Sequence, residues 1–426
     1  MIIHEKENCI LSEKKIDVSV IVTVYNIEEY IGNCLDSLLD QEGVDLEIIC
    51  VDDVSTDGSY DILCDYSRKD SRIKVIRNKQ NMGLSSARNV GFREARGEFL
   101  YNIDGDDLLK PGALKCLYSC AKENALDLLG FSAISFFDDD KMKDFGSENE
   151  YVRKGSYLDV KSGAELFAEL IDNNDRASSN MVLYFYNHKF FEENNLYGIE
   201  GLRYVDDSMF AMYMAAKRAM CIPDQLYMRR YRKGSVVTSP MQKCYLESMI
   251  VLFLAELQIW QKSNISDELN KKIEKYFNSR QESIRSFYNK FRNDNSETTF
   301  LNQHVMAKYF YKYFIEEVPL HNDCLSIEEI NNLKSMDSII LYGAGYMANE
   351  VAKVLEYNGI DNYEVAVTDT YINPERFRGR KVCGIEDIIC DKEKTVVVVA
   401  ISKKNFDSVM KLLKSMNYEN VNWVTF

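Results

Sequence analysis

The chain has 426 residues, a hydrophobic fraction of 46% and a formal net charge of −15 at pH 7. This length is too great for one ordinary domain and predicts about two or three domains with cores of normal composition. The strong negative charge argues against a nucleic-acid-binding protein, which would need a basic surface. An acidic protein can still bind an anionic nucleotide where a metal ion and local arginines reverse the field at the site.

The sequence shows no targeting or membrane-spanning signal. Its start is polar and lacks the apolar core of a signal peptide. The longest apolar stretch, near 249–257, is far shorter than the roughly 20 residues that cross a bilayer. The 11 cysteines form no C-x-x-C pair and only 4 histidines are present, so we expect reduced thiols and no zinc site. We therefore expect a soluble, cytoplasmic protein.

Strands and helices alternate in the N-terminal part of the chain. The apolar, β-branched run 18–24 predicts a buried parallel strand, and Asn26 is expected to cap the next helix, with Glu28 and Glu29 in its first turn. The other expected elements are strand 46–51, a turn at 55–58, a helix ending near 67, strand 73–77, helix 85–96 and strand 98–103. This alternation predicts an α/β fold with a doubly wound parallel sheet.

Two groups of carboxylates follow apolar strands of this part. They are Asp-Gly-Asp-Asp at 104–107 and Asp-Asp at 52–53. Carboxylates packed so closely repel one another and lose solvation when buried, unless a cation lies among them, and hard oxygen ligands suit Mg²⁺ or Mn²⁺. Because doubly wound sheets bind ligands beyond the carboxyl ends of their strands, we expect one site there for a metal ion and its phosphate-bearing ligand.

The segment from about 239 to 334 predicts long helices, since it contains few glycines or prolines. Apolar and aromatic side chains between 273 and 291 keep helical spacing and are interleaved with lysines and arginines. One interpretation is a basic amphipathic face that rests on a membrane or an acidic partner. The other, which we favour, is a core stripe flanked by solvated charges.

The C-terminal part predicts a small α/β domain. Gly343 and Gly345, in the pattern G-x-G-x-x-A after a strand, fit a dinucleotide-binding turn, and Asp369 stands where a ribose-binding acid belongs. The expected elements are strand 338–341, helix 347–357, strand 363–367, strand 396–401 and helix 404–416. Because helix–strand packing alone can demand such glycines, we favour a docking or oligomerisation role for this domain and keep nucleotide binding as the alternative. The predicted domains are 1–238, 239–335 and 336–426.

Several segments resemble family 2 glycosyltransferases with the GT-A fold. In family order, they are Val20–Asn26, Val51–Ser59, Asn81–Asn89, Ile103–Asp107, Tyr204–Phe210 and Tyr227–Arg232. Each is weak alone, but their occurrence in order is specific. The resemblance implies a GT-A doubly wound mixed sheet, followed by a helical segment and a small Rossmann-like domain. That last domain is similar to the nucleotide-sugar-binding domains found beside some sugar-modifying transferases.

The resemblance also implies roles for individual residues. Tyr25 would stack on the nucleobase and Asp53 would accept the imide N–H of uracil. Asp106 would be the chief ligand of Mn²⁺ or Mg²⁺, with Asp104 close to the ribose or the metal, and the cation would stabilise charge on the departing diphosphate. The remaining expected donor-binding residues are Thr23, Arg88, Arg230 and Arg232, the arginines as partners of phosphates or of the acidic group.

The general base is the least defined of these roles. Asp206 matches the family's catalytic aspartate, which accepts the proton of the attacking hydroxyl and assists by about 10²–10⁴ in rate. The glutamate usual before this aspartate is replaced by Val205, which leaves the register between Asp206 and Asp207 open. We favour Asp206 as the base and interpret Asp207 as support for a helix N-terminus. A single in-line displacement would invert the anomeric configuration.

These features together predict an inverting, metal-dependent glycosyltransferase of bacterial surface-glycan assembly. It would transfer a sugar from a nucleotide-sugar donor to a glycan or lipid-linked acceptor at the inner face of the membrane. The donor that we expect is a UDP-linked sugar. Peripheral membrane contact and a homo-oligomer stay open. One alternative is a non-catalytic nucleotide-sugar sensor or scaffold. A metal-dependent nucleotidyltransferase ranks lower, because the loop Tyr25–Glu28 after the first strand is neither glycine-rich nor basic.

Overall fold

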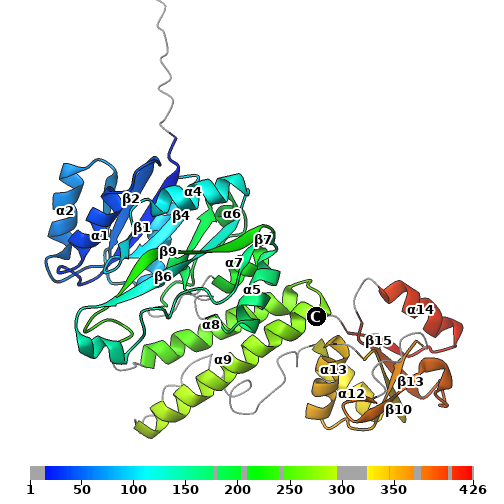
Figure 1. Ribbon diagram of the computed structural model, residues 1–426. Helices are drawn as coiled ribbons and strands as arrows, with labels where there is room; N and C mark the ends of the chain where they lie inside the picture. The colour runs from blue at the N-terminus through cyan, green and yellow to red at the C-terminus, as the bar shows by residue number, and fades with distance from the viewer. Residues whose placement is uncertain are drawn as a thin grey trace, which may run out of the picture. The chain divides into compact units, whose positions relative to one another are not determined.

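The computed structural model describes residues 15–175, 180–202, 209–239, 243–294, 324–344, 346–368, 376–401 and 405–424. The chain divides into two units, 1–248 and 249–426, which can be found in Figure 1 by its colours, since these run from blue to red with residue number. The three-domain division expected from the sequence stays a prediction.

The first unit is built on one mixed sheet. Among the described residues its nine strands run in the order β3-β2-β1-β4-β8-β6-β9-β5, with β7 paired to β9. Strands β1 to β4 are mutually parallel, whereas β8 is antiparallel to both of its neighbours. The strands are β1 Val18–Val24, β2 Leu46–Asp52, β3 Ile73–Arg77, β4 Phe99–Asp104, β5 Leu108–Leu109, β6 Leu128–Phe137, β7 Tyr157–Lys161, β8 Tyr184–Asn187 and β9 Ala219–Tyr231.

Helices flank this sheet, and α1 and α2 lie beside its first strands (Figure 1). The described α-helices are α1 Ile31–Leu39, α2 Ser59–Lys69, α3 Leu84–Arg93, α4 Ala113–Glu123, α5 Gly163–Asp172, α6 His188–Glu193 and α7 Met209–Ala215, with 3₁₀ turns at Asp140–Asp144 and Met181–Leu183. Strand β1 is wholly buried, as its apolar, β-branched sequence predicts. The α/β class with a doubly wound mixed sheet is confirmed.

The expected helix cap at Asn26 is wrong. Helix α1 begins at Ile31, and Asn26 instead adopts a left-handed conformation with φ 52°. Its Oδ1 accepts a hydrogen bond from Thr56 N at 2.8 Å, and Glu28 accepts one from Gly58 N. These polar side chains therefore join the β1–α1 loop to the β2–α2 loop, so they are not available to the helix terminus.

Substitution by alanine should change the stability of the protein differently at two helical glycines of this unit. A Cβ on Gly91 of α3 would lie 2.4 Å from Ile21 Cγ2 of β1, whereas one on Gly32 of α1 would meet nothing closer than Tyr66 Oη at 3.4 Å. We expect Gly91→Ala to lower the free energy of unfolding by about 1–3 kcal/mol through overpacking. Gly32→Ala should leave it unchanged or raise it by about 0.5–1 kcal/mol. Urea unfolding of both variants checks this, and equal effects would contradict it.

Two long helices follow in the chain, as expected, and the first of them spans the boundary between the two units. Helices α8 Lys243–Lys262 and α9 Asp267–Asp294 pack through aromatic side chains: Trp260 stacks on Phe277 with ring centres 4.7 Å apart, and Phe253 meets the same ring edge-on. Ile273, Phe277 and Ile284 of the apolar stripe are fully buried. The core-stripe interpretation therefore holds for these residues, and their apolar face is not free to rest on a membrane.

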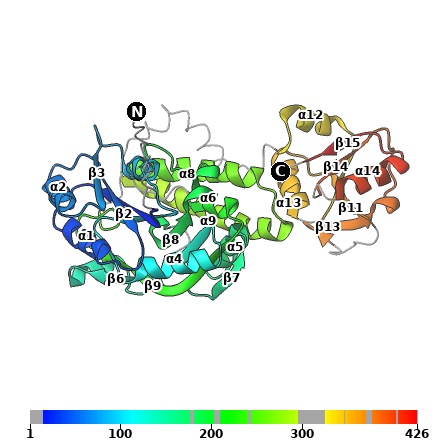
Figure 2. The same ribbon diagram turned by 90° about the horizontal axis from the view of Figure 1, so that it is seen from above.

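The second unit continues as a small doubly wound domain. Its described strands run in the order β12-β13-β11-β10-β14-β15, and all pairings but β12–β13 are parallel. The elements are α12 Ile327–Ser335, β10 Ser338–Tyr342, α13 Tyr346–Tyr357, β11 Tyr363–Val367, β12 Arg376–Phe377, β13 Arg380–Gly384, β14 Thr395–Val399, α14 Phe406–Ser415 and β15 Val421–Trp423 (Figure 2), with a 3₁₀ turn at Ile385–Asp387.

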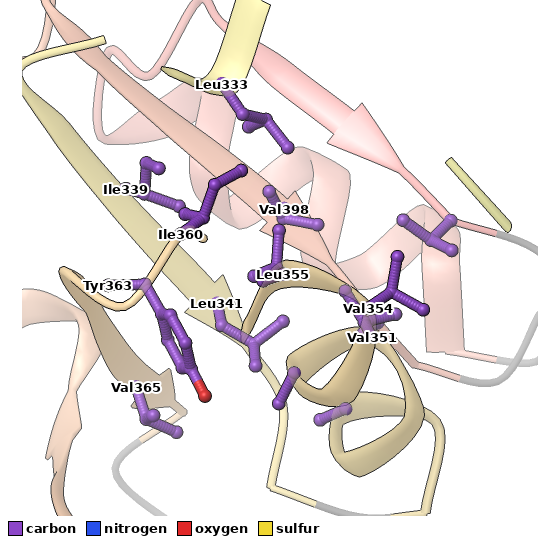
Figure 3. Close-up of a cluster of buried hydrophobic side chains, with 14 of the residues drawn as sticks. Leu333, Ile339, Leu341, Val351, Val354, Leu355, Ile360, Tyr363, Val365 and Val398 are labelled. Atoms are coloured by element: carbon purple, nitrogen blue, oxygen red, sulfur yellow. The ribbon is translucent and has the colours of Figure 1, made fainter. Parts of the chain in front are cut away.

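Each face of this second sheet carries its own core. On one face, α13 places Val351, Val354 and Leu355 against Leu341 of β10 and Val398 of β14 (Figure 3). On the other face, the buried side chains of α14 pack against alternate residues of the same two strands. Strands buried on both faces explain the nearly continuous apolar runs from which the domain was predicted.

A buried glutamate should make the stability of the second unit depend on pH. Glu350 of α13 is 1% exposed and accepts from Lys353 Nζ at 2.7 Å, and Lys353 also bonds Glu274 of α9. Burial, and then the charge of Glu274, raise the pKa of Glu350 from 4.5 to about 7. The folded state therefore binds more protons than the unfolded state between these pH values, so stability falls as pH rises through them.

We expect Glu350→Gln to remove this loss, which is on the order of 2 kcal/mol between about pH 5 and about pH 8. Urea unfolding of wild type and variant at the two pH values measures the difference. The same pH dependence in both proteins would contradict the assignment.

Candidate functional site

The carboxyl ends of three parallel strands meet at one edge of the first sheet. Thr23 of β1 pairs with Asp104 of β4, and Val24 pairs with Asp52 of β2. The next residue, Asp53, donates its N–H to the carbonyl of Val24 at 2.9 Å. The strand register therefore brings the two acidic groups of the sequence to the same edge, where open α/β sheets bind their ligands.

A pocket of about 380 Å³ opens at this edge. The expected donor and metal residues that line it are Thr23, Tyr25, Asp53, Asp104, Asp106, Arg230 and Arg232. The ring of Tyr25 is 50% exposed, which leaves a face available for stacking. Arg88 is 3% exposed and lies behind the lining. The described residues thus bring the expected donor-binding side chains together around one cavity.

Asp53 has a structural role of its own. Its carboxylate is 4% exposed and accepts hydrogen bonds from Asn78 Nδ2 at 2.7 Å, from Met82 N at 2.9 Å and from Gly83 N at 2.9 Å. These contacts fix the loop before α3 and hold that helix with its first residue, Leu84, in the pocket wall. Any contact of Asp53 to a nucleobase stays a prediction and would be made by a carboxylate already held in place by main-chain donors.

Arginines contact two members of the acid cluster, defined here as Asp104, Asp106 and Asp107. Arg88 Nη2 lies 2.9 Å from Asp104 Oδ1, and Arg232 Nε lies 2.7 Å from Asp106 Oδ2. The side chain of Asp104 is 38% exposed and that of Asp106 is 18% exposed. Both carboxylates therefore keep one face toward the pocket while a guanidinium compensates part of their charge.

Asp107 does not cap the helix that follows it. Helix α4 begins at Ala113, six residues later, with Gly112 before it. The Asp107 carboxylate is instead buried and accepts from Tyr227 Oη and from Arg230 N, the latter at 2.6 Å. It therefore joins the acid cluster to β9, which contains Arg230 and ends one residue before Arg232.

Burial and mutual repulsion dominate the electrostatics of this cluster. Burial raises the pKa of Asp107 well above its usual value, and the charges of Asp106 and Asp104 raise it further. Burial also raises the pKa of Asp106, with Arg232 opposing and Asp104 adding to the shift. A cation among these carboxylates would relieve both causes, since it compensates charge that the protein interior solvates poorly.

The structure adds pocket residues that the sequence reasoning missed. Arg229 lines the wall beside Arg230, and its guanidinium lies 4.6 Å from the ring centre of Tyr151. Ser235, Val236 and Val237 line the same pocket, and the two valines are 49% and 45% exposed. Arg229 could have been found from its place in the basic run at the end of β9. The valines carry no sequence signal, because exposed apolar side chains in a loop are common.

Both candidate bases, Asp206 and Asp207, lie outside the described residues, as do Gly345 and Asp369 of the second predicted nucleotide site. Gly343 is described, with φ 131°, and a Cβ there would lie 2.6 Å from the carbonyl oxygen of Ala400. The close approach of β10 to the end of β14 therefore accounts for this glycine without a ligand.

The described residues contain neither a preformed metal cluster nor a membrane-spanning helix. No group of three or more histidine, cysteine, aspartate or glutamate side chains there is arranged to hold a metal ion. In the same part of the chain, no helix is both long and apolar enough to cross a membrane.

Comparison with known proteins identifies relatives of this chain. The chain is 32% identical over 247 residues to the uncharacterized glycosyltransferase EpsJ of Bacillus subtilis, covering 57% of this chain and 69% of that protein. It is 31% identical over 264 residues to the putative glycosyltransferase EpsH of the same organism, covering 61% and 73% of the two chains. The family model described as glycosyl transferase family 2 matches residues 19–203.

The fold also has a solved counterpart. The crystal structure of Staphylococcus aureus TarS 1–349 in complex with UDP-GlcNAc superposes with a TM-score of 0.51 at 21% identity, covering 81% of this chain and 90% of that one. This likeness concerns the fold alone and confirms the GT-A-like class expected from the sequence. The sensor and nucleotidyltransferase alternatives are set aside by the relatives. With such relatives covered over more than two thirds of their length, the chain belongs to glycosyltransferase family 2 and is an enzyme of that family.

Proposed function

We propose that the protein is an inverting, metal-dependent glycosyltransferase that transfers a sugar from a UDP-linked donor to a hydroxyl of a surface-glycan acceptor. The observation that carries the proposal is the single pocket shared by the Tyr25 ring, Asp53, the carboxylates of Asp104 and Asp106, and arginines of β9. A nucleotide sugar needs these groups in one place: a ring for its base, compensation for its diphosphate, and donors for its phosphate oxygens.

Two observations support a UDP-linked donor. The segments that resemble the family include Tyr25 and Asp53, and the structural neighbour TarS was crystallised with UDP-GlcNAc. In this chain Asp53 is fixed by main-chain donors, so its carboxylate would meet a base as a rigid acceptor. We therefore propose Tyr25 and Asp53 for the base and Arg230 and Arg232 for the diphosphate.

The residues present fit a Mg²⁺ or Mn²⁺ ion held together with its substrate. Mg²⁺ is usually bound by one or two carboxylates and by substrate phosphates rather than by an all-protein cage. Asp106, with Asp104 beside it, supplies that donor set at the pocket wall, and a bound cation would offset the burial and the charge of Asp104, both of which raise the pKa of Asp106. Such an ion would stabilise the charge that develops on the departing diphosphate.

Asp206 is the proposed base, with Asp207 supporting the start of α7. The acceptor class rests on relatives, which include a poly(ribitol-phosphate) β-glucosyltransferase of Bacillus spizizenii, 43% identical over 114 residues. We propose a glycan or lipid-linked acceptor, used by a cytoplasmic enzyme at the inner face of the membrane. For residues 336–426 we propose a docking role, since packing explains Gly343.

The test is donor turnover. The full chain is incubated with Mn²⁺ and a panel of UDP-, GDP- and dTDP-sugars, and the released nucleotide is measured with and without EDTA. We expect slow release of UDP from one UDP-sugar, lost on chelation. Release from a GDP- or dTDP-sugar alone would contradict the UDP assignment. Activity unaffected by EDTA would contradict the metal requirement, and no release with added glycan acceptors would contradict the function.

A further inference from the structure

Tyr30 lies behind the pocket and has no role in the assignments above. It is the residue immediately before α1 and is half-buried. It is not part of the pocket lining. The guanidinium carbons of Arg230 and Arg232 lie 5.0 Å and 4.9 Å from the centre of its ring. One aromatic ring thus contacts both arginines that we propose for the diphosphate.

The same two arginines are aimed at the acid cluster. Arg232 Nε donates to Asp106 Oδ2 at 2.7 Å, and Arg230 Nε donates to the carbonyl of Asp106 at 2.9 Å. Arg230 Nη1 also donates to Asp138 at 2.9 Å. The side chains of Arg230 and Arg232 are only 12% and 13% exposed, so little solvent screens their like charges from each other.

An aromatic ring suits this arrangement for a physical reason. The faces of its π-system are negative and attract guanidinium groups, which stack on them without using their hydrogen-bond donors. The N–H groups of Arg230 and Arg232 already donate to Asp106, to Asp138 and, from Arg232 Nη1 at 3.5 Å, to the carbonyl of Lys233, and stacking on the ring occupies none of those that remain. Phe136 contributes a second ring, 4.6 Å from the guanidinium of Arg230. An aliphatic residue in place of Tyr30 would fill the space but would attract neither cation.

We propose that Tyr30 is a positioning residue whose ring holds Arg230 and Arg232 in the orientation that receives the diphosphate of the donor. This inference rests on the proposed function, since it needs a diphosphate in the pocket. The ring does not contact the substrate. It lowers the cost of ordering two long side chains at the moment of binding, so the phosphate contacts form with less loss of conformational entropy.

The experiment separates phosphate contacts from base contacts. Dissociation constants of UDP and of uridine, which lacks phosphate, are measured by calorimetry with Mn²⁺ for wild type, Tyr30→Phe and Tyr30→Leu. We expect Tyr30→Leu to weaken UDP binding by about 10-fold and to leave uridine binding within about two-fold. Tyr30→Phe keeps the ring and should restore UDP binding to within about two-fold of wild type.

A matched control is Tyr118→Leu, because Tyr118 is a partly buried tyrosine near Lys122 that lies outside the pocket lining. It should change neither constant. Equal weakening of UDP and uridine by Tyr30→Leu would indicate a general structural role and overturn the proposal. Equal losses in the Phe and Leu variants would assign the effect to the hydroxyl and also overturn it. A wild type that binds no UDP would overturn the proposed donor as well, whereas normal UDP binding by Tyr30→Leu would overturn the role of Tyr30 alone.

Discussion

Replacing Asp106 with alanine is expected to lower turnover of the nucleotide sugar by about 10²–10³-fold, the size of effect seen when one preorganised charge-stabilising group is removed. Asp106 is the proposed metal ligand, and it is also the partner of Arg232 at 2.7 Å. Its loss would leave the diphosphate with a weaker cation site and would free a guanidinium to bind the donor in an unproductive way. Initial rates of nucleotide release, measured over a range of Mn²⁺ concentrations, check the expectation.

The Mn²⁺ series distinguishes a metal ligand from an ion-pair partner. If Asp106 binds the metal, the variant should need a higher Mn²⁺ concentration for half-maximal rate. A normal Mn²⁺ requirement with reduced rate would instead assign Asp106 to the positioning of Arg232. The matched control is Asp140→Ala, because the Asp140 side chain is 94% exposed and pairs with Lys143 outside this pocket. We expect that variant to keep activity within about two-fold.

Much of the fold could be predicted because its signals are local. Strands Val18–Val24, Ile73–Arg77 and Tyr363–Val367 have the bounds expected from their apolar runs. The order of strands along the chain then predicts where their carboxyl ends meet, and the observed register brings Thr23 beside Asp104. The position of the acid cluster at a sheet edge thus follows from the sequence.

The parts that could not be predicted depend on partners far away in the chain. The carboxylate of Asp107 accepts a hydrogen bond from Tyr227, 120 residues later. Asn26 was expected to cap a helix, but it binds a loop 30 residues away. Aspartate and asparagine favour helix caps, turns and tertiary hydrogen bonds alike, so their type alone does not select among these. Nothing in the sequence near Tyr30 shows that two arginines, 200 and 202 residues later in the chain, stack on its ring.

The second large effect is expected at the base. Asp206→Asn should lower the rate of sugar transfer by about 10²–10⁴-fold, because an amide cannot accept the proton of the attacking hydroxyl. Binding of UDP should stay within about two-fold of wild type, since the base is proposed to contact the acceptor and not the nucleotide. Transfer to an acceptor is measured by product formation and donor affinity by calorimetry. The anomeric configuration of the product, read by NMR, tests the inversion that follows from a single displacement.

Asp207→Asn is the matched control, because it changes the same side chain one residue closer to α7, which begins at Met209. A carboxylate near a helix N-terminus contributes about 0.3–1 kcal/mol through the helix dipole, so this variant should lose a little stability and little activity. The pair distinguishes loss of the base from loss of a negative charge, since both substitutions remove one charge at adjacent positions in the sequence. If Asp207→Asn is inactive while Asp206→Asn turns over normally, the base is Asp207, and the replacement of the usual glutamate by Val205 has shifted the register by one residue.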